Sequence, residues 1–160
     1  AGLIRKYKGR FILSQECRKL LKSGGSAALY PRLFRAYVQR FNWGYWDGYP
    51  ELPFLQRAFL FTLFALNRFG SQWRPSNFYA DTFLSAFPAI LDEVPPDTYF
   101  SPEESVRRAY TWRILVHFVE FLGLARVKPE KDEPMERNYQ VIALPLLQEV
   151  VQFRKGVVPR

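Results

Sequence analysis

The sequence predicts a mainly α-helical fold with two small β-hairpins, built as a helical bundle. Of the 160 residues, 48% are hydrophobic and 24% are charged, a balance typical of a packed globular protein. Several stretches carry apolar residues at helical spacing. Two other stretches each have the pattern of two short strands on either side of a turn. Aromatic residues make up 18% of the chain, so we expect rings to fill much of the core.

The chain is expected to begin with a hairpin. Residues 3–13 have the pattern of two strands around a turn at Lys8 and Gly9, where glycine supplies a positive φ. Ser14 is a candidate N-cap for a short helix that ends at Leu21. The Ser-Gly-Gly-Ser sequence at 23–26 predicts a flexible linker.

Four longer helices are predicted, over residues 27–42, 53–69, 75–87 and 101–122, and a short helix over 145–153. The 53–69 helix is apolar nearly all round, which favours a central position. Strands at 124–128 and 139–144 form the second predicted hairpin.

The strongest local signal is the start of the 101–122 helix, where Ser101 and Glu104 form the pattern of a capping box. Its predicted apolar stripe includes His117. Three arginines are assigned to its exposed side: Arg107, Arg108 and Arg113.

Two domains are predicted. Residues 1–22 form a basic hairpin with a short helix, and residues 27–160 form an aromatic-rich helical domain. Because the chain begins at Ala1, inside an expected strand, we expect it to be a fragment of a longer protein. No signal peptide pattern is present, and the lone Cys17 favours a reducing, cytoplasmic location.

Positive charge is concentrated at one end of the chain. Residues 1–40 contain ten Lys or Arg and a single acid, Glu16, whereas residues 41–160 contain thirteen Lys or Arg and fourteen acids. A localised basic surface indicates a polyanionic partner such as nucleic acid. The alternatives are a solvated edge strand protected by lysines, or a surface that docks an acidic protein or another domain.

The candidate nucleic-acid contacts lie on the first hairpin and the helix after it: Arg5, Lys6, Lys8, Arg10, Arg18, Lys19 and Lys22. Because strand residues alternate between faces, the hairpin cations cannot all point the same way. A candidate ligand or partner loop contains four rings: Trp43, Tyr45, Trp46 and Tyr49. The alternative is that these rings pack into the core.

Other chemistry has weaker support. His117 is interpreted as a core residue, and Cys17 as a small apolar one. A metal-dependent hydrolase would have to use the carboxylates of the middle segment: Asp81, Asp92, Glu93 and Asp97. We expect no cofactor and no metal site. We also expect no membrane partner, because the longest apolar run, 59–66, is too short to span a bilayer.

A weak internal repeat links the two hairpins. Residues 2–6 match 123–128, and residues 11–13 match 141–144; each hairpin leads into a short helix. This order resembles the end of a winged-helix domain, in which the hairpin is the wing and the preceding helix reads DNA. The chain also resembles uncharacterised bacterial proteins with winged-helix-like tails, of undefined function. The resemblance places a winged-helix-like unit at about 75–153.

The acidic tip of the second hairpin would be repelled by phosphate, so only the first hairpin suits DNA. The sequence therefore predicts a non-enzymatic module that binds nucleic acid through its basic hairpin. The alternative is a protein-interaction or regulatory domain.

Overall fold

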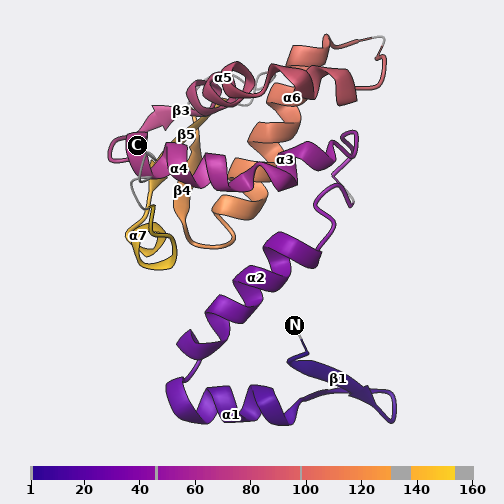
Figure 1. Cartoon of the computed structure of the whole chain (residues 1–160), viewed down its shortest axis with the longest axis vertical. Coiled ribbons are helices and arrows are strands. Elements are labelled where there is room, and N and C mark those ends of the chain that lie inside the picture. Colours follow the sequence, from indigo (N-terminus) through magenta and orange to yellow (C-terminus); the bar gives the residue numbers. More distant parts are fainter. Residues whose placement is uncertain (1, 46, 98, 131–137, 154–160) are drawn as a thin grey trace, which may run out of the picture. The chain divides into compact units, whose positions relative to one another are not determined.

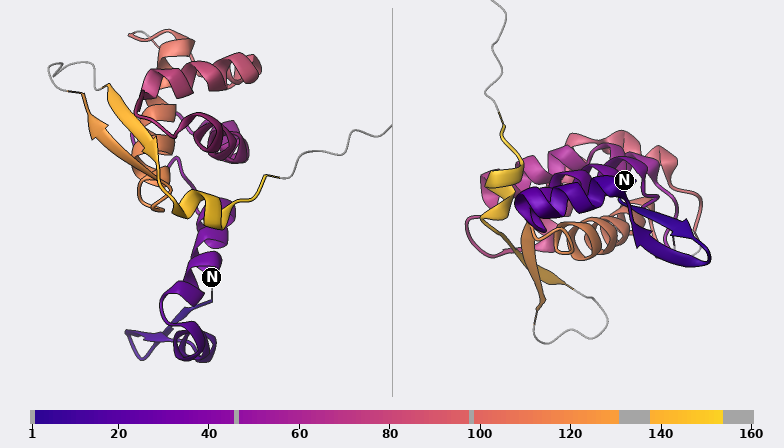
Figure 2. Two further views of the ribbon diagram at one scale, coloured as in Figure 1. Left: turned by 90° about the vertical axis from the view of Figure 1, so that its left-hand side faces the viewer. Right: turned by 90° about the horizontal axis from the view of Figure 1, so that it is seen from below.

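The computed structural model describes residues 2–45, 47–97, 99–130 and 138–153 (Figures 1 and 2). It is mainly helical, with one two-stranded and one three-stranded antiparallel sheet. The predicted fold class is confirmed. The acidic hairpin tip at 131–137 and Trp46 lie outside the described residues.

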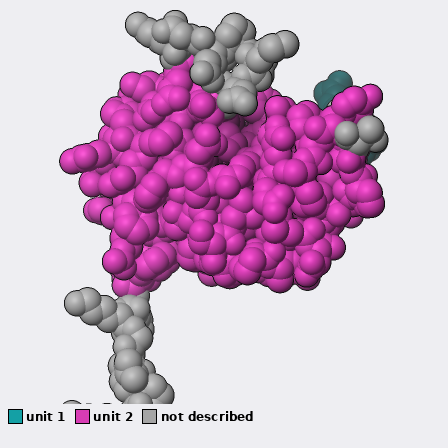
Figure 3. All heavy atoms as spheres, turned by 90° about the horizontal axis from the view of Figure 1, so that it is seen from above, with its two compact units in different colours: residues 1–42 teal, residues 43–160 magenta. Residues whose placement is uncertain are grey.

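The chain forms two compact units, residues 1–42 and residues 43–160, which are coloured separately in Figure 3. The sequence had placed the boundary at 23–26. Instead, Ser23 and Gly24 end helix α1 (Gln15–Gly24), and Gly25 caps it with a φ of 63°. The 3₁₀ turn η1 (Ala27–Leu29) packs directly against α1. The two glycines thus form a tight corner between helices, and the segment after them belongs with the hairpin.

The first unit begins with strands β1 (Ile4–Tyr7) and β2 (Arg10–Leu13). Lys8 and Gly9 connect them with φ values of 46° and 78°, the positive pair that a two-residue hairpin turn requires. The predicted cap of α1 is confirmed, because Ser14 Oγ accepts a hydrogen bond from the Cys17 amide at 3.1 Å. Helix α2 (Tyr30–Arg40) follows η1 and ends the unit.

The second unit contains most of the helices. The predicted 53–69 helix is divided at Ala58 (φ −88°, ψ 11°) into α3 (Pro53–Arg57) and α4 (Phe59–Phe69). Ser101 Oγ accepts from the Glu104 amide as predicted, while the Glu104 carboxylate accepts from Arg108. The remaining helical segments before the second hairpin are α5 (Ser76–Ala86), η2 (Pro88–Glu93), α6 (Pro102–Ala109) and η3 (Tyr110–Val119).

The second hairpin belongs to a three-stranded sheet. Strands β4 (Ala125–Pro129) and β5 (Tyr139–Ala143) pair as predicted, and a two-residue strand, β3 (Arg74–Pro75), pairs with the other edge of β5 (Figure 1). Val141 of the central strand pairs with Arg74 and Val127, and it is fully buried. Helix α7 (Leu146–Val150) follows the sheet.

Gly70 allows α4 to end directly against β5. A Cβ atom at this position would lie 2.4 Å from the Leu66 carbonyl oxygen and 2.8 Å from Ala143 Cβ. The Ala143 amide donates to the Gly70 carbonyl at 2.9 Å, which holds the two segments together. Close packing therefore requires a glycine at the end of α4.

The second half of the predicted 101–122 helix is π-helical. Its i→i+5 bonds include Glu120 N to Leu115 O at 3.2 Å, and the wider turn shifts which side chains face the core. His117 is exposed, which corrects its predicted place on the apolar stripe, and Phe121 is also exposed. Arg113, predicted to be exposed, is buried.

Two tyrosines are fully buried in the core of the second unit. The Tyr110 and Thr62 hydroxyls hydrogen-bond at 3.0 Å, and burial raises the pKa of Tyr110 well above its ordinary value. Burial also raises the pKa of Tyr79 to about 12, against a smaller opposing effect of the Arg74 charge. The Tyr79 hydroxyl has no hydrogen-bond partner among the described residues.

Candidate functional site

The candidate nucleic-acid contacts all lie in the first unit, and all seven side chains are exposed. The strand register separates the hairpin cations. Arg5 pairs with Ile12 and Tyr7 pairs with Arg10, so these four share one face; Lys6 pairs with Phe11 and lies on the other face. The expectation that the hairpin cations point in different directions is confirmed.

Tyr7 is the centre of a cationic cluster, which we call the Tyr7 face: Arg5, Tyr7, Lys8 and Arg10. The guanidinium carbon of Arg5 lies 5.8 Å from the centroid of the Tyr7 ring, and Lys8 Nζ lies 5.6 Å from it. Arg10 is the direct cross-strand neighbour of Tyr7. The face therefore holds three exposed positive charges around one aromatic ring.

Helix α1 adds the other three candidate cations. Arg18 Nη2 donates to the Leu13 carbonyl at 3.2 Å, which ties the helix to the end of β2. Lys19 and Lys22 are exposed. Glu16, the only acid of residues 1–40, forms an ion pair with Arg32 of α2 at 2.5 Å. Among the described residues, the seven candidate cations form no ion pair.

Sequence reasoning left α2 outside the site, although this helix adds to the same charge. It contains Arg32, Arg35 and Arg40, all exposed, and no acidic residue. The apolar side of α2 is aromatic, with the rings of Tyr30 and Phe34 stacked at 6.1 Å between centroids. These arginines are among the ten cations of residues 1–40, and that count was the signal that could have placed them in the candidate site.

The aromatic loop does not act as one surface. Trp43 is buried and stacks on Phe118 with 3.9 Å between ring centroids, as the alternative reading expected. Tyr45 is exposed, and Trp46 lies outside the described residues. Among the described rings of this loop, Tyr49 alone lines a cleft. The predicted ligand loop is thus divided between core, solvent and cleft.

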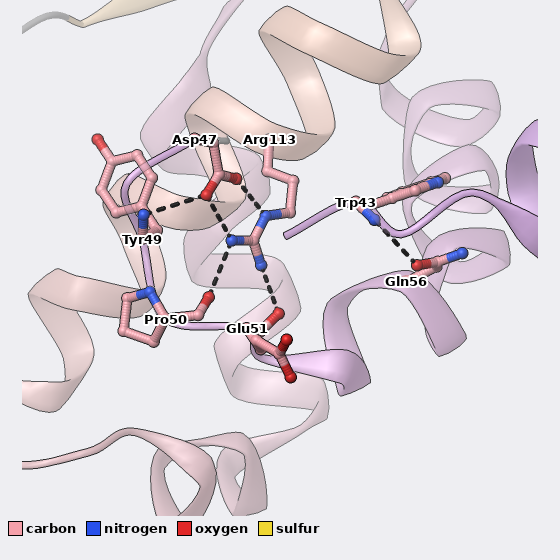
Figure 4. A network of polar contacts seen from close by, with 7 residues as sticks. All are labelled: Trp43, Asp47, Tyr49, Pro50, Glu51, Gln56 and Arg113. Atoms are coloured by element: carbon pink, nitrogen blue, oxygen red, sulfur yellow. Dashed lines mark hydrogen bonds and ion pairs between the residues drawn. The ribbon is translucent and has the colours of Figure 1, made fainter. Parts of the chain in front are cut away.

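A buried ion pair between Asp47 and Arg113 fixes this loop (Figure 4). Arg113 donates to both Asp47 carboxylate oxygens, from Nε at 2.5 Å and from Nη2 at 2.8 Å. It also donates to the carbonyls of Pro50 at 2.8 Å and Glu51 at 2.7 Å. The Tyr49 amide donates to Asp47 Oδ1 at 3.0 Å. One guanidinium therefore holds residues 47–51 against η3, an arrangement that sequence reasoning missed.

The fixed loop borders a cleft of about 570 Å³ in the second unit, within the size range of small-molecule sites. Asn77 Nδ2 donates to Asn138 Oδ1 at 3.1 Å across one end of it. Its lining carries charges of both signs, with Arg107 and Arg108 beside Asp47 and Glu104. The described lining residues are Asp47, Tyr49, Asn77, Glu104, Arg107, Arg108, Thr111, Trp112, Asn138 and Tyr139.

Three of the four carboxylates weighed for a metal-dependent hydrolase have separate partners. Asp81 forms an ion pair with Arg107, and Glu93 forms one with Arg57 at 3.1 Å. Asp97 accepts from the Tyr99 amide at 2.7 Å, in a local turn. Within the described residues, no three His, Cys, Asp or Glu side chains gather where they could hold a metal ion.

The two remaining candidates have ordinary surroundings. His117 lies on the surface with its ring 4.9 Å from that of Trp112, in an edge-to-face contact. Cys17 is a buried residue in the first turn of α1. In the part of the chain that the structure describes, no helix combines the length and the apolar character needed to cross a membrane.

No protein-family model, curated protein or solved structure matches this chain.

Proposed function

We propose that this chain is a non-enzymatic module that binds nucleic acid, with the Tyr7 face of the first unit on the phosphate backbone. The observation that carries the proposal is an exposed cationic surface with almost no carboxylate to neutralise it. Ten Lys or Arg and one acid lie within residues 1–40, and that acid is already paired with Arg32. A surface of this kind attracts a polyanion and releases its counterions on binding.

The geometry of the hairpin supports contact with a backbone. Arg5, Lys8 and Arg10 can each reach a phosphate from one face, and the Tyr7 ring between them offers a surface for a sugar or a base. Phosphate contacts position a protein without reading sequence. We therefore expect binding with little preference among sequences.

The order of elements in the second unit supports a winged-helix-like arrangement as part of the same proposal. A short strand, a helix, a second helix and an antiparallel hairpin follow each other, and β3 pairs with β5. In this unit the charges are more balanced: Arg107 and Arg108 each form an ion pair, and Glu130 at the base of the hairpin is exposed. We assign the nucleic-acid contact to the first hairpin for this reason.

The test is the salt dependence of binding to a 20-base-pair duplex, measured by fluorescence anisotropy from 50 to 200 mM salt. The variant Arg5→Ala/Lys8→Ala/Arg10→Ala removes the cations of the Tyr7 face. If each contacts one phosphate, the slope of log K against log salt should become shallower by about 2.7, or about 0.9 for each lost contact. Affinity should fall for every duplex sequence tested.

Two matched controls accompany this variant. Lys6→Ala removes a cation of the same hairpin from the opposite face, and Arg126→Ala removes an exposed cation from the second unit. Each should change the slope by well under 1. A full-length chain that does not bind the duplex at 50 mM salt, or a triple variant with an unchanged slope, contradicts the proposal.

A further inference from the structure

The two hairpins share a detailed geometry that the sequence repeat only suggests. Each follows a glycine with positive φ, 68° at Gly2 and 72° at Gly123, and then a buried leucine, Leu3 or Leu124. In each hairpin the residue after the second strand donates its amide to the carbonyl of that leucine at 2.9 Å. These donors are Ser14 and Leu144, so the structural repeat pairs Ser14 with Leu144.

This equivalence places the two sheets in register. Because Ile4 pairs with Leu13 and Ala125 pairs with Ala143, Ile4 corresponds to Ala125 and Leu13 to Ala143. Two residues further along, the pair Lys6–Phe11 corresponds to the pair Val127–Val141. The face of the first hairpin opposite the Tyr7 face therefore has a counterpart in the second hairpin.

The counterpart face is more covered than the face of the first hairpin. In the second unit Ala125 is 1% exposed, Val141 is fully buried, and Val127 and Ala143 are half-buried; helices α4, α5 and η3 contact these strands. In the first hairpin Ile4 is 59% exposed, Phe11 79% and Leu13 42%. We call this the Phe11 face: Ile4, Lys6, Phe11 and Leu13. It leaves three large apolar side chains in water around a single lysine.

We propose that the Phe11 face docks an amphipathic helix with an apolar stripe flanked by carboxylates. The helical nature of the occupant is inferred from the second hairpin, where helices contact the equivalent strands and bury Ala125 and Val141. Its acidic flanks follow from charge, because Lys6 lies within the apolar face and the surrounding unit has one acid among ten cations. Apolar burial would supply the binding free energy, and the charges would orient the helix.

This inference is separate from the proposed contact with nucleic acid, because the Tyr7 face and the Phe11 face lie on opposite sides of the same two strands. A helix on one face leaves the phosphate-binding cations of the other face accessible. The hairpin would then join a helical partner to a nucleic acid.

The test uses the full chain and a 21-residue fluorescent peptide with leucine at i, i+3, i+4 and i+7 and with Glu and Ala elsewhere. We expect saturable binding, together with amide chemical-shift changes at residues 4–13. Phe11→Ser should weaken binding about 10-fold or more, since burying a Phe side chain contributes enough for a factor of that size. Tyr45→Ser, which removes an exposed ring from the second unit, is the matched control and should bind as the parent does.

Because Phe11 is largely exposed, its replacement should leave the far-ultraviolet circular dichroism unchanged. Peptide binding that is absent, or equal in the parent and the Phe11→Ser variant, overturns the proposal. A concentration-dependent dimer of the parent chain that Phe11→Ser abolishes would assign the face to a second copy instead. Equal losses of duplex and peptide binding in Phe11→Ser would assign it to nucleic acid. The triple variant of the Tyr7 face should lose duplex binding alone, which separates a failure of either proposal from a failure of the other.

Discussion

Replacing Arg113 with methionine tests the buried ion pair that holds the aromatic loop. The Arg113 side chain is 1% exposed and donates four hydrogen bonds, two to Asp47 and one each to the carbonyls of Pro50 and Glu51. Methionine retains much of the length of the side chain but none of its donors. Asp47 would then be a buried charge without its partner, and two carbonyls would lose their hydrogen bonds.

These contacts set the expected loss in the free energy of unfolding. Removing one partner of a buried ion pair typically costs about 3–5 kcal/mol in the free energy of unfolding. For a chain of this size, about 2–4 °C in Tm accompanies each kcal/mol, so we expect Tm to fall by about 6–20 °C. Urea unfolding followed by tryptophan fluorescence and by circular dichroism gives the free energy directly.

Arg57→Met is the matched control, because Arg57 is exposed and forms its 3.1 Å ion pair with Glu93 near the surface. Exposed pairs contribute about 0–1 kcal/mol, so this variant should unfold close to the parent. A double variant with Asp47→Asn should lose less than the sum of the two single losses, since the unpaired charge is gone. An Arg113→Met variant that unfolds within about 1 kcal/mol of the parent would show that the buried ion pair does not stabilise the fold.

Three further predictions concern the core of the second unit. Gly70→Ala should destabilise the fold by about 1–3 kcal/mol, measured by urea unfolding, because the new methyl group meets Leu66 and Ala143; an unchanged midpoint would contradict the close packing. Tyr79→Phe should raise Tm, because it removes a buried hydroxyl without a partner among the described residues; a lower Tm would indicate a partner. The Tyr79 and Tyr110 hydroxyls should make stability fall between pH 10 and about 12, because the folded state keeps both groups protonated after the unfolded chain releases those protons. Unfolding midpoints measured across this pH range test whether stability decreases as the pH rises. The Tyr79→Phe variant should show a smaller decrease than the parent.

Local signals predicted the local structure well. The serine caps at Ser14 and Ser101 and the turn at Lys8 and Gly9 act within three or four residues, and each appears where the sequence placed it. A cap or a tight turn satisfies backbone groups next to it in the chain. Its residue type is therefore informative without knowledge of the rest of the fold.

The errors arose where distant contacts decide the structure. Helical periodicity assumes a constant turn, and the π-helical segment η3 changes that turn, which exposes His117 and buries Arg113. The partner of Arg113 is Asp47, 66 residues earlier, and no spacing rule connects them. Likewise, Gly24 and Gly25 suggest a linker when read alone, but contacts between α1 and η1 make them a corner.

The distribution of charge separates the electrostatic roles of the two units. In the second unit, the thirteen Lys or Arg and the fourteen acids are close in number and several are paired, so their fields largely cancel beyond the range set by salt screening. The described pairs of this unit are Arg57–Glu93, Arg107–Asp81, Arg108–Glu104 and Arg113–Asp47. In the first unit a single carboxylate faces ten cations, so most of that charge has nothing nearby to cancel it. In the proposed function, long-range attraction of a polyanion would therefore originate in the first unit. A charge-reversing pair of substitutions in the second unit would leave the salt slope intact, whereas one new carboxylate on the Tyr7 face would reduce it.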